Sequence, residues 1–391
     1  MNKIRLNQLD GLRGLFCLIV VLTHFPQKNT LLTNNFIVNQ GYLFVDFFFV
    51  LSGFVIAFNY YDKIKDGASF KDYLGKRFLR LFPLLLFSVT VYLFLEIFFF
   101  IFFPNYLAHQ QTFGSLLYLA ADSITFLNST PLLGKTLGMN YPSWSISAEM
   151  IAYLIFGLVV LFAPKRNKIY LAILFICAMM VPASLKNYVL EGDWGFVRGT
   201  MCFIAGVFAY FAFQRLQNFK ISKAFEYVVP VLLIGVFYFR SVYYGDVKVS
   251  PGREMFTLFV IPVFFALSIL VYAKSTGLLV NVLTGRFFQF TGRVSYSIYL
   301  NHAVLLIIVT RLMFNVLHVP VSSMATYIAL AISFLTVLVY SQFTYVYIEK
   351  MGKRRLAKLL APPEKKSDKL LQPVSYKSQV QLEREQALQS A

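Results

Sequence analysis

The stretch LLLFSVTVYLFLEIFFFIFF, residues 84–103, contains a single charged side chain, that of Glu96. A helix of about 20 apolar residues is long enough to cross the roughly 30 Å of hydrocarbon in a bilayer. We therefore predict that this stretch spans a membrane. Similar runs recur throughout the 391 residues, of which 58% are hydrophobic and 14% are charged. Soluble domains carry about 25% charged residues, so a soluble core is excluded.

Proline, glycine and charged residues separate ten apolar segments, which predict an all-α polytopic bundle. The expected spans are 11–27, 41–60, 81–103, 142–163, 169–185, 194–214, 225–241, 253–273, 295–313 and 323–348. An even number of spans places both termini on one side of the membrane. The more polar segment 115–133 is expected to be re-entrant or interfacial, and if it spans instead, the later topology inverts.

The net charge of +18 is distributed unevenly between the two sides of this topology. With ten spans, 28 of the 36 Lys and Arg residues fall on the side of the amino terminus. Because cytoplasmic loops carry the excess of basic residues, both termini are predicted to be cytoplasmic. The basic residues lie between apolar segments rather than on one soluble face, so no nucleic-acid partner is expected.

The composition changes near residue 350. Residues 1–350 form the predicted transmembrane domain, and residues 351–391 form a basic cytoplasmic tail, expected to begin as an interfacial helix and to end in a partly disordered segment. The three cysteines lie in apolar segments without paired spacing. They predict neither a disulfide framework nor a metal site.

Ionisable side chains inside apolar spans are costly and are therefore the first candidates for chemistry. Arg13 and His24 are eleven residues apart, which places them about 20° apart on one helix face with a rise of about 16 Å. Glu149 and His302 reach about the depth of His24 in their own spans. We predict that both histidines and the carboxylate share one layer, with Asp46 as a weaker fourth member that holds the tautomer of the imidazole. Alternatively, each histidine only hydrogen-bonds a neighbouring helix.

Hydroxyl groups accompany these ionisable side chains. Ser145 precedes Glu149 by four residues, and Tyr299 precedes His302 by three, so each pair shares a helix face. These hydroxyls could position an acceptor hydroxyl group.

A group of arginines is expected at the cytoplasmic boundary. Arg77 and Arg80 lie one turn apart, and Arg13, Arg286 and Arg293 fall at the same level. Guanidinium groups bind phosphates in a bidentate manner, so this ring suits a polyanion such as coenzyme A. The alternative is that these residues only follow the positive-inside rule or extend to lipid headgroups.

Five motifs carry a resemblance to a known family. They are LDGLRG (9–14) leading to His24, VDFFFVLSGF (45–54), RFLRLFP (77–83), SWSISAE (143–149) and SYSIYLNH (295–302). In this order they resemble the motifs of the acyltransferase-3 family of integral-membrane acyltransferases, over about residues 5–348.

The resemblance implies a membrane-embedded O-acyltransferase that uses a cytoplasmic acyl-CoA as co-substrate and has no permanently bound cofactor. The expected acyl group is acetyl, with succinyl or another short acyl group as the alternative. The expected acceptor is a hydroxyl of a carbohydrate, on a cell-surface or exported glycan, and the expected location is the inner membrane of a bacterium.

The resemblance also assigns roles to residues. His24 is the expected base, with Glu149 or Asp46 orienting it, and His302 is a further catalytic candidate; a transient acyl-histidine is a variant of this scheme. The residues expected to bind coenzyme A are Arg13, Arg77, Arg80 and Arg293. Those expected to bind the acceptor are Trp144, Ser145, Ser147 and Tyr299.

Two other functions compete with this interpretation. A membrane transporter or flippase of a glycan or lipid-linked intermediate would use the polar layer as a path for its substrate, and a receptor would use it for neither chemistry nor transport. Transporters built from repeats show matching Gly or Pro breaks in two halves, and this chain has no such symmetry. The expected surroundings are the lipid bilayer, and the sequence is compatible with a homo-oligomer.

Overall fold

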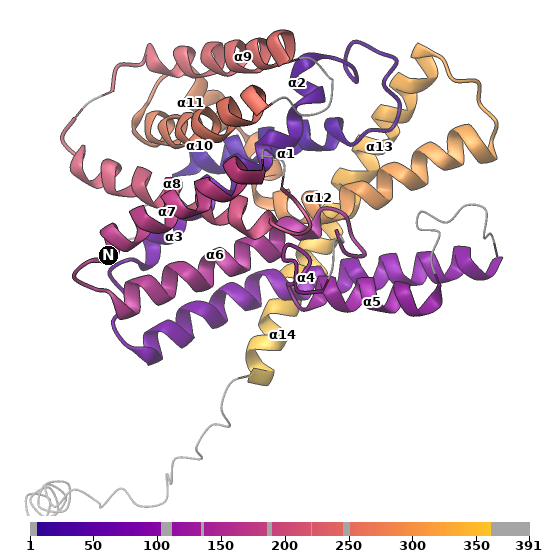
Figure 1. Ribbon diagram of the computed structural model, residues 1–391. Coiled ribbons are helices and arrows are strands. Elements are labelled where there is room, and N and C mark those ends of the chain that lie inside the picture. The colour runs from indigo at the N-terminus through magenta and orange to yellow at the C-terminus, as the bar shows by residue number, and fades with distance from the viewer. Residues whose placement is uncertain are drawn as a thin grey trace, which may run out of the picture. The chain divides into compact units, whose positions relative to one another are not determined.

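The structure is a computed structural model that describes residues 6–102, 112–133, 137–185, 190–219, 221–244 and 251–360 (Figure 1). Every regular element within these ranges is a helix. The prediction of an all-α, polytopic membrane protein is confirmed. The predicted disordered end of the tail, residues 361–391, lies outside the described residues.

Each of the ten expected spans coincides with a long helix. These helices are α1 (Asn7–Thr23), α3 (Phe44–Tyr60), α4 (Gly67–Phe102), α6 (Ser143–Phe162), α7 (Asn167–Leu185), α8 (Gly195–Arg215), α9 (Phe225–Tyr244), α10 (Pro251–Lys274), α12 (Arg286–Arg311) and α13 (Ser323–Thr344). Eight helical segments are long and apolar enough to cross a membrane, while α1 and the described apolar part of α10 are shorter. Helix α4 begins 14 residues before the expected span, because its charged first turns continue the same helix.

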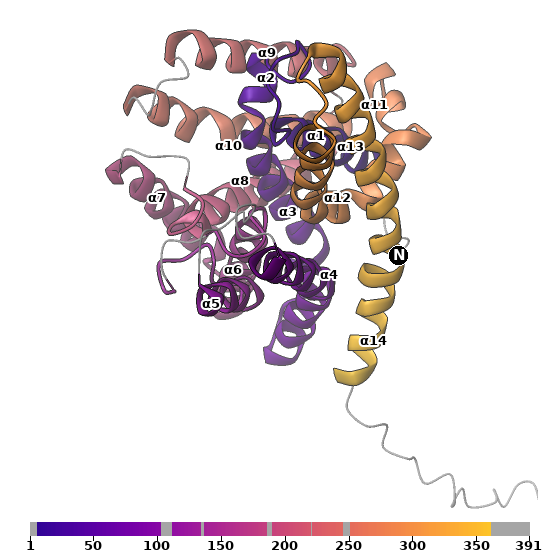
Figure 2. The same cartoon turned by 90° about the vertical axis from the view of Figure 1, so that its right-hand side faces the viewer.

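Short helices connect and extend these spans. They are α2 (Phe36–Asn39), η1 (Gly41–Leu43), α5 (Phe113–Ile124), α11 (Leu278–Leu283), the π-helical turns η3 (Leu312–Val316) and η4 (Tyr345–Lys350), and α14 (Met351–Leu360). Helix α5 has 12 residues and is therefore about 18 Å long, too short to cross the hydrocarbon core. It packs beside α4 (Figures 1 and 2).

Two close helix pairs form the centre of the bundle. Helix α3 packs against α8, and α1 packs against α12. A Cβ atom at Gly53 would lie 1.9 Å from the carbonyl oxygen of Phe203, and one at Gly206 would lie 1.8 Å from that of Val50. Glycine at both positions therefore lets the backbones of α3 and α8 approach closely, as small residues do between membrane helices.

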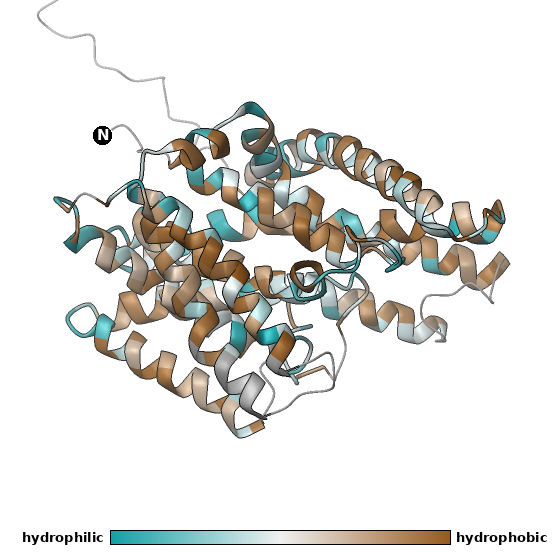
Figure 3. Cartoon of the chain, turned by 90° about the horizontal axis from the view of Figure 1, so that it is seen from above, coloured by the Kyte–Doolittle hydropathy of each residue, from teal (hydrophilic) through white to brown (hydrophobic). Residues whose placement is uncertain are grey.

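Polar and apolar side chains are distributed as in a membrane protein. Exposed apolar side chains, such as Ile176 on α7 and Leu232 on α9, occupy outer helix faces, whereas Asp46, Arg198 and His302 are buried. Figure 3 shows brown, hydrophobic residues along most of the helices and teal, hydrophilic residues gathered in the connecting loops. The chain divides into two units at Lys353, close to the predicted start of the tail.

Candidate active site

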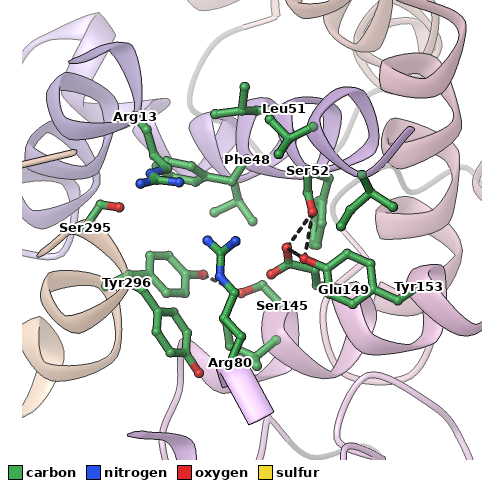
Figure 4. A pocket seen from close by; sticks show the side chains of 16 residues that line it. Arg13, Phe48, Leu51, Ser52, Arg80, Ser145, Glu149, Tyr153, Ser295 and Tyr296 are labelled. Atoms are coloured by element: carbon green, nitrogen blue, oxygen red, sulfur yellow. Dashed lines mark hydrogen bonds between the residues drawn. The ribbon is translucent and has the colours of Figure 1, made fainter. Parts of the chain in front are cut away.

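A partly open pocket lies among α1, α3, α4, α6 and α12 (Figure 4). Its walls are mainly apolar, and its polar groups come from α1, α3, α4, α6 and α12. The polar lining residues are Arg13, Ser52, Arg80, Ser145, Glu149, Tyr153, Ser295, Tyr296 and Tyr299. The pocket therefore combines two cations and one carboxylate with several hydroxyl groups.

Arg13 is held in place by the close approach of α1 and α12. A Cβ atom at Gly292 would lie 2.0 Å from the carbonyl oxygen of Asp10, so only glycine allows this contact. The Arg13 guanidinium donates to the carbonyl oxygen of Gly292 from Nη2 at 2.6 Å and from Nε at 3.2 Å. It also pairs with Asp10 at 3.3 Å. Arg13 is therefore a fixed cation at the pocket wall.

Arg80 extends into the pocket from α4 and faces Arg13 across it (Figure 4). Within the described residues its guanidinium makes no hydrogen bond and no ion pair shorter than 4.0 Å; Glu149 and Glu349 interact with it only at longer range. A cation that is directed into a pocket without a close partner is suited to an anionic ligand.

Glu149 lies opposite Arg80 and is hydrogen-bonded within its own cluster. The Ser52 hydroxyl donates to Glu149 Oε1 at 2.6 Å, and the Tyr153 hydroxyl donates to the same oxygen. Neither Ser52 nor Tyr153 was among the residues predicted to form the site. A signal for Tyr153 was present, since it lies one turn after Glu149 on the same helix face.

Tyr299 and Ser145 form the end of the pocket that lies toward the histidines. The Ser145 and Tyr299 hydroxyls lie 2.8 Å apart, which joins α6 to α12, and Ser145 Oγ also lies 3.0 Å from the carbonyl oxygen of Pro142. The ring of Tyr299 packs edge-on against Phe48, with centroids 6.1 Å apart, and lies 5.9 Å from the ring of His302. Both hydroxyl residues therefore lie between the pocket and the imidazoles.

The structure brings His24 and His302 together, with ring centroids 5.0 Å apart. Nδ1 of His24 lies 2.9 Å from the carbonyl oxygen of Val20, and Nδ1 of His302 lies 2.7 Å from that of Tyr299. A carbonyl oxygen only accepts, so we assign the proton of each neutral ring to Nδ1 and the lone pair to Nε2. Nε2 of His302 is buried and has no hydrogen-bond partner among the described residues.

The predicted orientation of His24 by a carboxylate needs correction, because the backbone carbonyl of Val20 holds its Nδ1. Asp46 instead accepts hydrogen bonds from Nε and Nη2 of Arg198, at 2.8 and 3.1 Å. Both partners are almost completely buried. A buried carboxylate is costly without a cation, which explains why Asp46 faces α8 rather than the imidazole.

Four other predicted residues lie away from the pocket lining. Arg77 donates to the Tyr60 hydroxyl at 2.9 Å, and Arg293 lies over the ring of Phe290. Trp144 packs under the guanidinium of Arg198. Ser147 donates to the carbonyl oxygen of Phe126 at 2.5 Å and lies 2.7 Å from the Ser129 hydroxyl. Within the described ranges, no three His, Cys, Asp or Glu side chains are arranged to hold a metal ion.

The helices and the site define a polytopic membrane protein with a cation-bearing pocket beside two histidines, of which His302 is buried. A family model described as an acyltransferase domain matches residues 6–341. The chain belongs to this family, acyltransferase-3, and is a membrane acyltransferase. No curated protein and no solved structure matches the chain.

Proposed function

We propose that the protein transfers an acyl group, acetyl in the first instance, from acyl-CoA to a hydroxyl of a carbohydrate. The observation that carries this proposal is the guanidinium of Arg80, which lacks a close partner among the described residues and extends into the pocket. Tyr299, which lines the same pocket, lies with its ring 5.9 Å from that of His302. An anionic donor would enter at the arginines, and the reacting bond would lie near Tyr299.

The arginines explain a preference for a coenzyme A thioester. Arg80, with Arg13 beside it, offers donors that match phosphate oxygens, and charge-assisted hydrogen bonds of this kind are about twice as strong as neutral ones. The apolar walls beyond them, including Phe48 and Leu51, suit the narrow pantetheine arm. Because Phe48 packs against Tyr299 at the inner end, a short acyl group such as acetyl fits better than a long one.

Tyr299 and Ser145 are suited to stabilise the thioester oxygen. The Ser145 hydroxyl lies within hydrogen-bond distance of both the Pro142 carbonyl oxygen and the Tyr299 hydroxyl. When its single proton is donated to Tyr299, the phenolic proton of Tyr299 is available to donate to the thioester oxygen. A donor aimed at the developing oxyanion typically contributes 10²–10³ in turnover. In this scheme the acceptor oxygen attacks the thioester carbon, a C–O bond forms, and the C–S bond breaks.

In this scheme His24 is the base that accepts the proton of the acceptor hydroxyl and passes it to the leaving group. Nε2 of His24 takes the proton of the attacking hydroxyl, and the resulting imidazolium returns it to the coenzyme A thiolate. The ring of His302 lies 5.0 Å from that of His24, and its buried Nε2 has no hydrogen-bond partner among the described residues. In this scheme a small rotation of either ring would let that Nε2 accept a hydrogen bond from the imidazolium. A two-step variant, in which an imidazole carries the acyl group transiently, uses the same atoms.

The sidedness follows from the predicted topology. Arg13 and Arg80 lie toward the cytoplasmic ends of α1 and α4, whereas His24 lies at the other end of α1. The donor would therefore come from the cytoplasm, and the acceptor glycan from the opposite face of a bacterial inner membrane.

The test uses the full chain, purified in lipid nanodiscs, with acetyl-CoA labelled in the acetyl group and a panel of glycans. The expected result is labelled, alkali-labile ester on a glycan together with an equal amount of free coenzyme A. A folded protein that binds coenzyme A and transports glycan without forming an ester would contradict the proposal and favour the transporter.

A further inference from the structure

His24 packs against an aromatic ring that the proposed mechanism does not use and that does not line the pocket. Tyr141 lies with its ring centroid 5.5 Å from that of His24, edge to face, and its side chain is 38% exposed. The preceding residue fixes this turn, because Asn140 Nδ2 donates to the carbonyl oxygen of Leu300 at 2.9 Å and to Ser88 Oγ at 3.2 Å. The Tyr141 ring is thus a rigid, open surface beside the expected base.

A carboxylate completes this surface. The Tyr141 hydroxyl donates to Glu191 Oε2 at 3.0 Å, and Glu191 lies in the segment that leads into α8. Arg198, in the first turn of α8, acts electrostatically on both residues and is itself held by Asp46. The buried Arg198–Asp46 ion pair therefore anchors the start of α8, directly after Glu191 in the chain. Glu191 was not among the predicted site residues.

The charged groups that line the pocket differ from the one beside Tyr141. The pocket presents Arg13 and Arg80, which favour phosphates, whereas Tyr141 lies beside a carboxylate at partial exposure. A carboxylate disfavours anions but accepts hydrogen bonds from hydroxyl groups, and an aromatic face packs against the C–H surface of a sugar ring. This combination fits a neutral polyol and does not fit coenzyme A.

We propose that Tyr141 and Glu191 form the acceptor subsite, in which a sugar ring packs on Tyr141 and two neighbouring hydroxyls contact Glu191, so that a further hydroxyl reaches Nε2 of His24. This inference rests on the proposed function, because it deepens the identity of the acceptor. The competing interpretation is that the Tyr141–Glu191 hydrogen bond only fastens a loop.

The experiment measures the KM for the acceptor, the KM for acetyl-CoA and turnover in nanodiscs for Glu191→Gln, Tyr141→Phe and Tyr141→Ala. Glutamine has the shape of glutamate and still accepts from Tyr141, so Glu191→Gln removes the charge with little change in packing. Loss of a hydrogen bond to a charged partner corresponds to roughly a 10–100-fold change. We expect that rise in acceptor KM for Glu191→Gln and Tyr141→Ala, a smaller rise for Tyr141→Phe, and less than a twofold change in the KM for acetyl-CoA.

The matched control is Tyr170→Phe, which removes the hydroxyl of an exposed tyrosine on another helix, α7. It is expected to leave both KM values and turnover unchanged. A wild-type protein that forms ester normally, with an acceptor KM that Glu191→Gln does not alter, overturns the inference and leaves the proposed function intact. If the variants fold in lower yield but keep the acceptor KM of the wild type, the inference is likewise overturned and the proposed function stays intact. A wild-type protein that forms no glycan ester overturns both.

Discussion

The substitution Arg80→Gln removes a cation that lines the pocket and makes no hydrogen bond or short ion pair with the described residues. If Arg80 binds a phosphate of the donor, its loss removes one or more charge-assisted hydrogen bonds, each contributing about 1.5–3 kcal/mol. Since about 1.4 kcal/mol corresponds to tenfold in affinity, the Kd for acyl-CoA is expected to rise roughly 10–150-fold. Because Arg80 has no close partner to leave unsatisfied, thermal stability without donor is expected to stay nearly constant.

Arg77→Gln is the matched control, because Arg77 lies one turn earlier on α4 but donates to Tyr60. Its loss removes a hydrogen bond that contributes about 1 kcal/mol to folding, and it leaves the pocket unchanged. We therefore expect lower stability and near-normal donor affinity, the opposite pattern to Arg80→Gln. Isothermal titration of coenzyme A, combined with thermal unfolding in the same nanodiscs, measures both quantities. Equal losses of donor affinity in the two variants would refute the assignment of the donor site to Arg80.

Further outcomes follow from other parts of the site. His24→Ala is expected to lower turnover per folded molecule by roughly 10²–10⁴ with normal coenzyme A binding, and a folded variant that keeps more than a tenth of the activity would move the base to His302. Tyr299→Phe is expected to lower turnover by about 10²–10³ without changing donor affinity, as single-turnover kinetics would show. Asp46→Asn should destabilise the fold by roughly 3–5 kcal/mol in thermal unfolding, because Arg198 stays buried without its carboxylate. Burial raises the pKa of Glu191 above its usual value of 4.5, as does the nearby Asp46, while Arg198 and Tyr141 lower it. The carboxylate is protonated as the pH falls through that raised pKa, so acceptor KM should rise on acidification in the wild type and be flat with pH in Glu191→Gln.

The spans were predictable because hydrophobicity over about 20 residues is a property of the local sequence. Their ends were less so. The expected third span began at residue 81, but α4 begins at Gly67, since helical hydrogen bonds continue through charged residues that hydropathy excludes. The short length of α5 agrees with the sequence, because polar residues interrupt the apolar run in segment 115–133.

The closeness of the two histidines was predictable from their positions along the spans, but the partner of Asp46 was not. Counting residues from the span ends placed His24 and His302 in one layer, and their rings are 5.0 Å apart. The same counting placed Asp46 near His24, whereas its carboxylate is bound by Arg198. Depth fixes one coordinate of a side chain, while helix rotation and the order of helices around the bundle fix the others. Arg198 carried a usable signal, because it is a charged residue four positions into an apolar helix and therefore requires a buried partner.

The pairing of two histidines solves a problem that a single buried base would face. An imidazole that accepts a proton inside an apolar bundle becomes a cation with few groups to solvate it, which is costly. Here both rings keep Nδ1 on a backbone carbonyl, so both Nε2 atoms are free to accept. When one Nε2 takes the hydroxyl proton, its N–H can donate toward the Nε2 of the other ring, and the charge is then shared between two rings instead of isolated on one. The buried Nε2 of His302, which has no partner among the described residues of the resting protein, is therefore suited to the moment of proton transfer. A double-mutant cycle tests this coupling: if the rings act as a unit, losing both should cost little more than losing His24 alone, whereas independent rings would give additive losses in turnover.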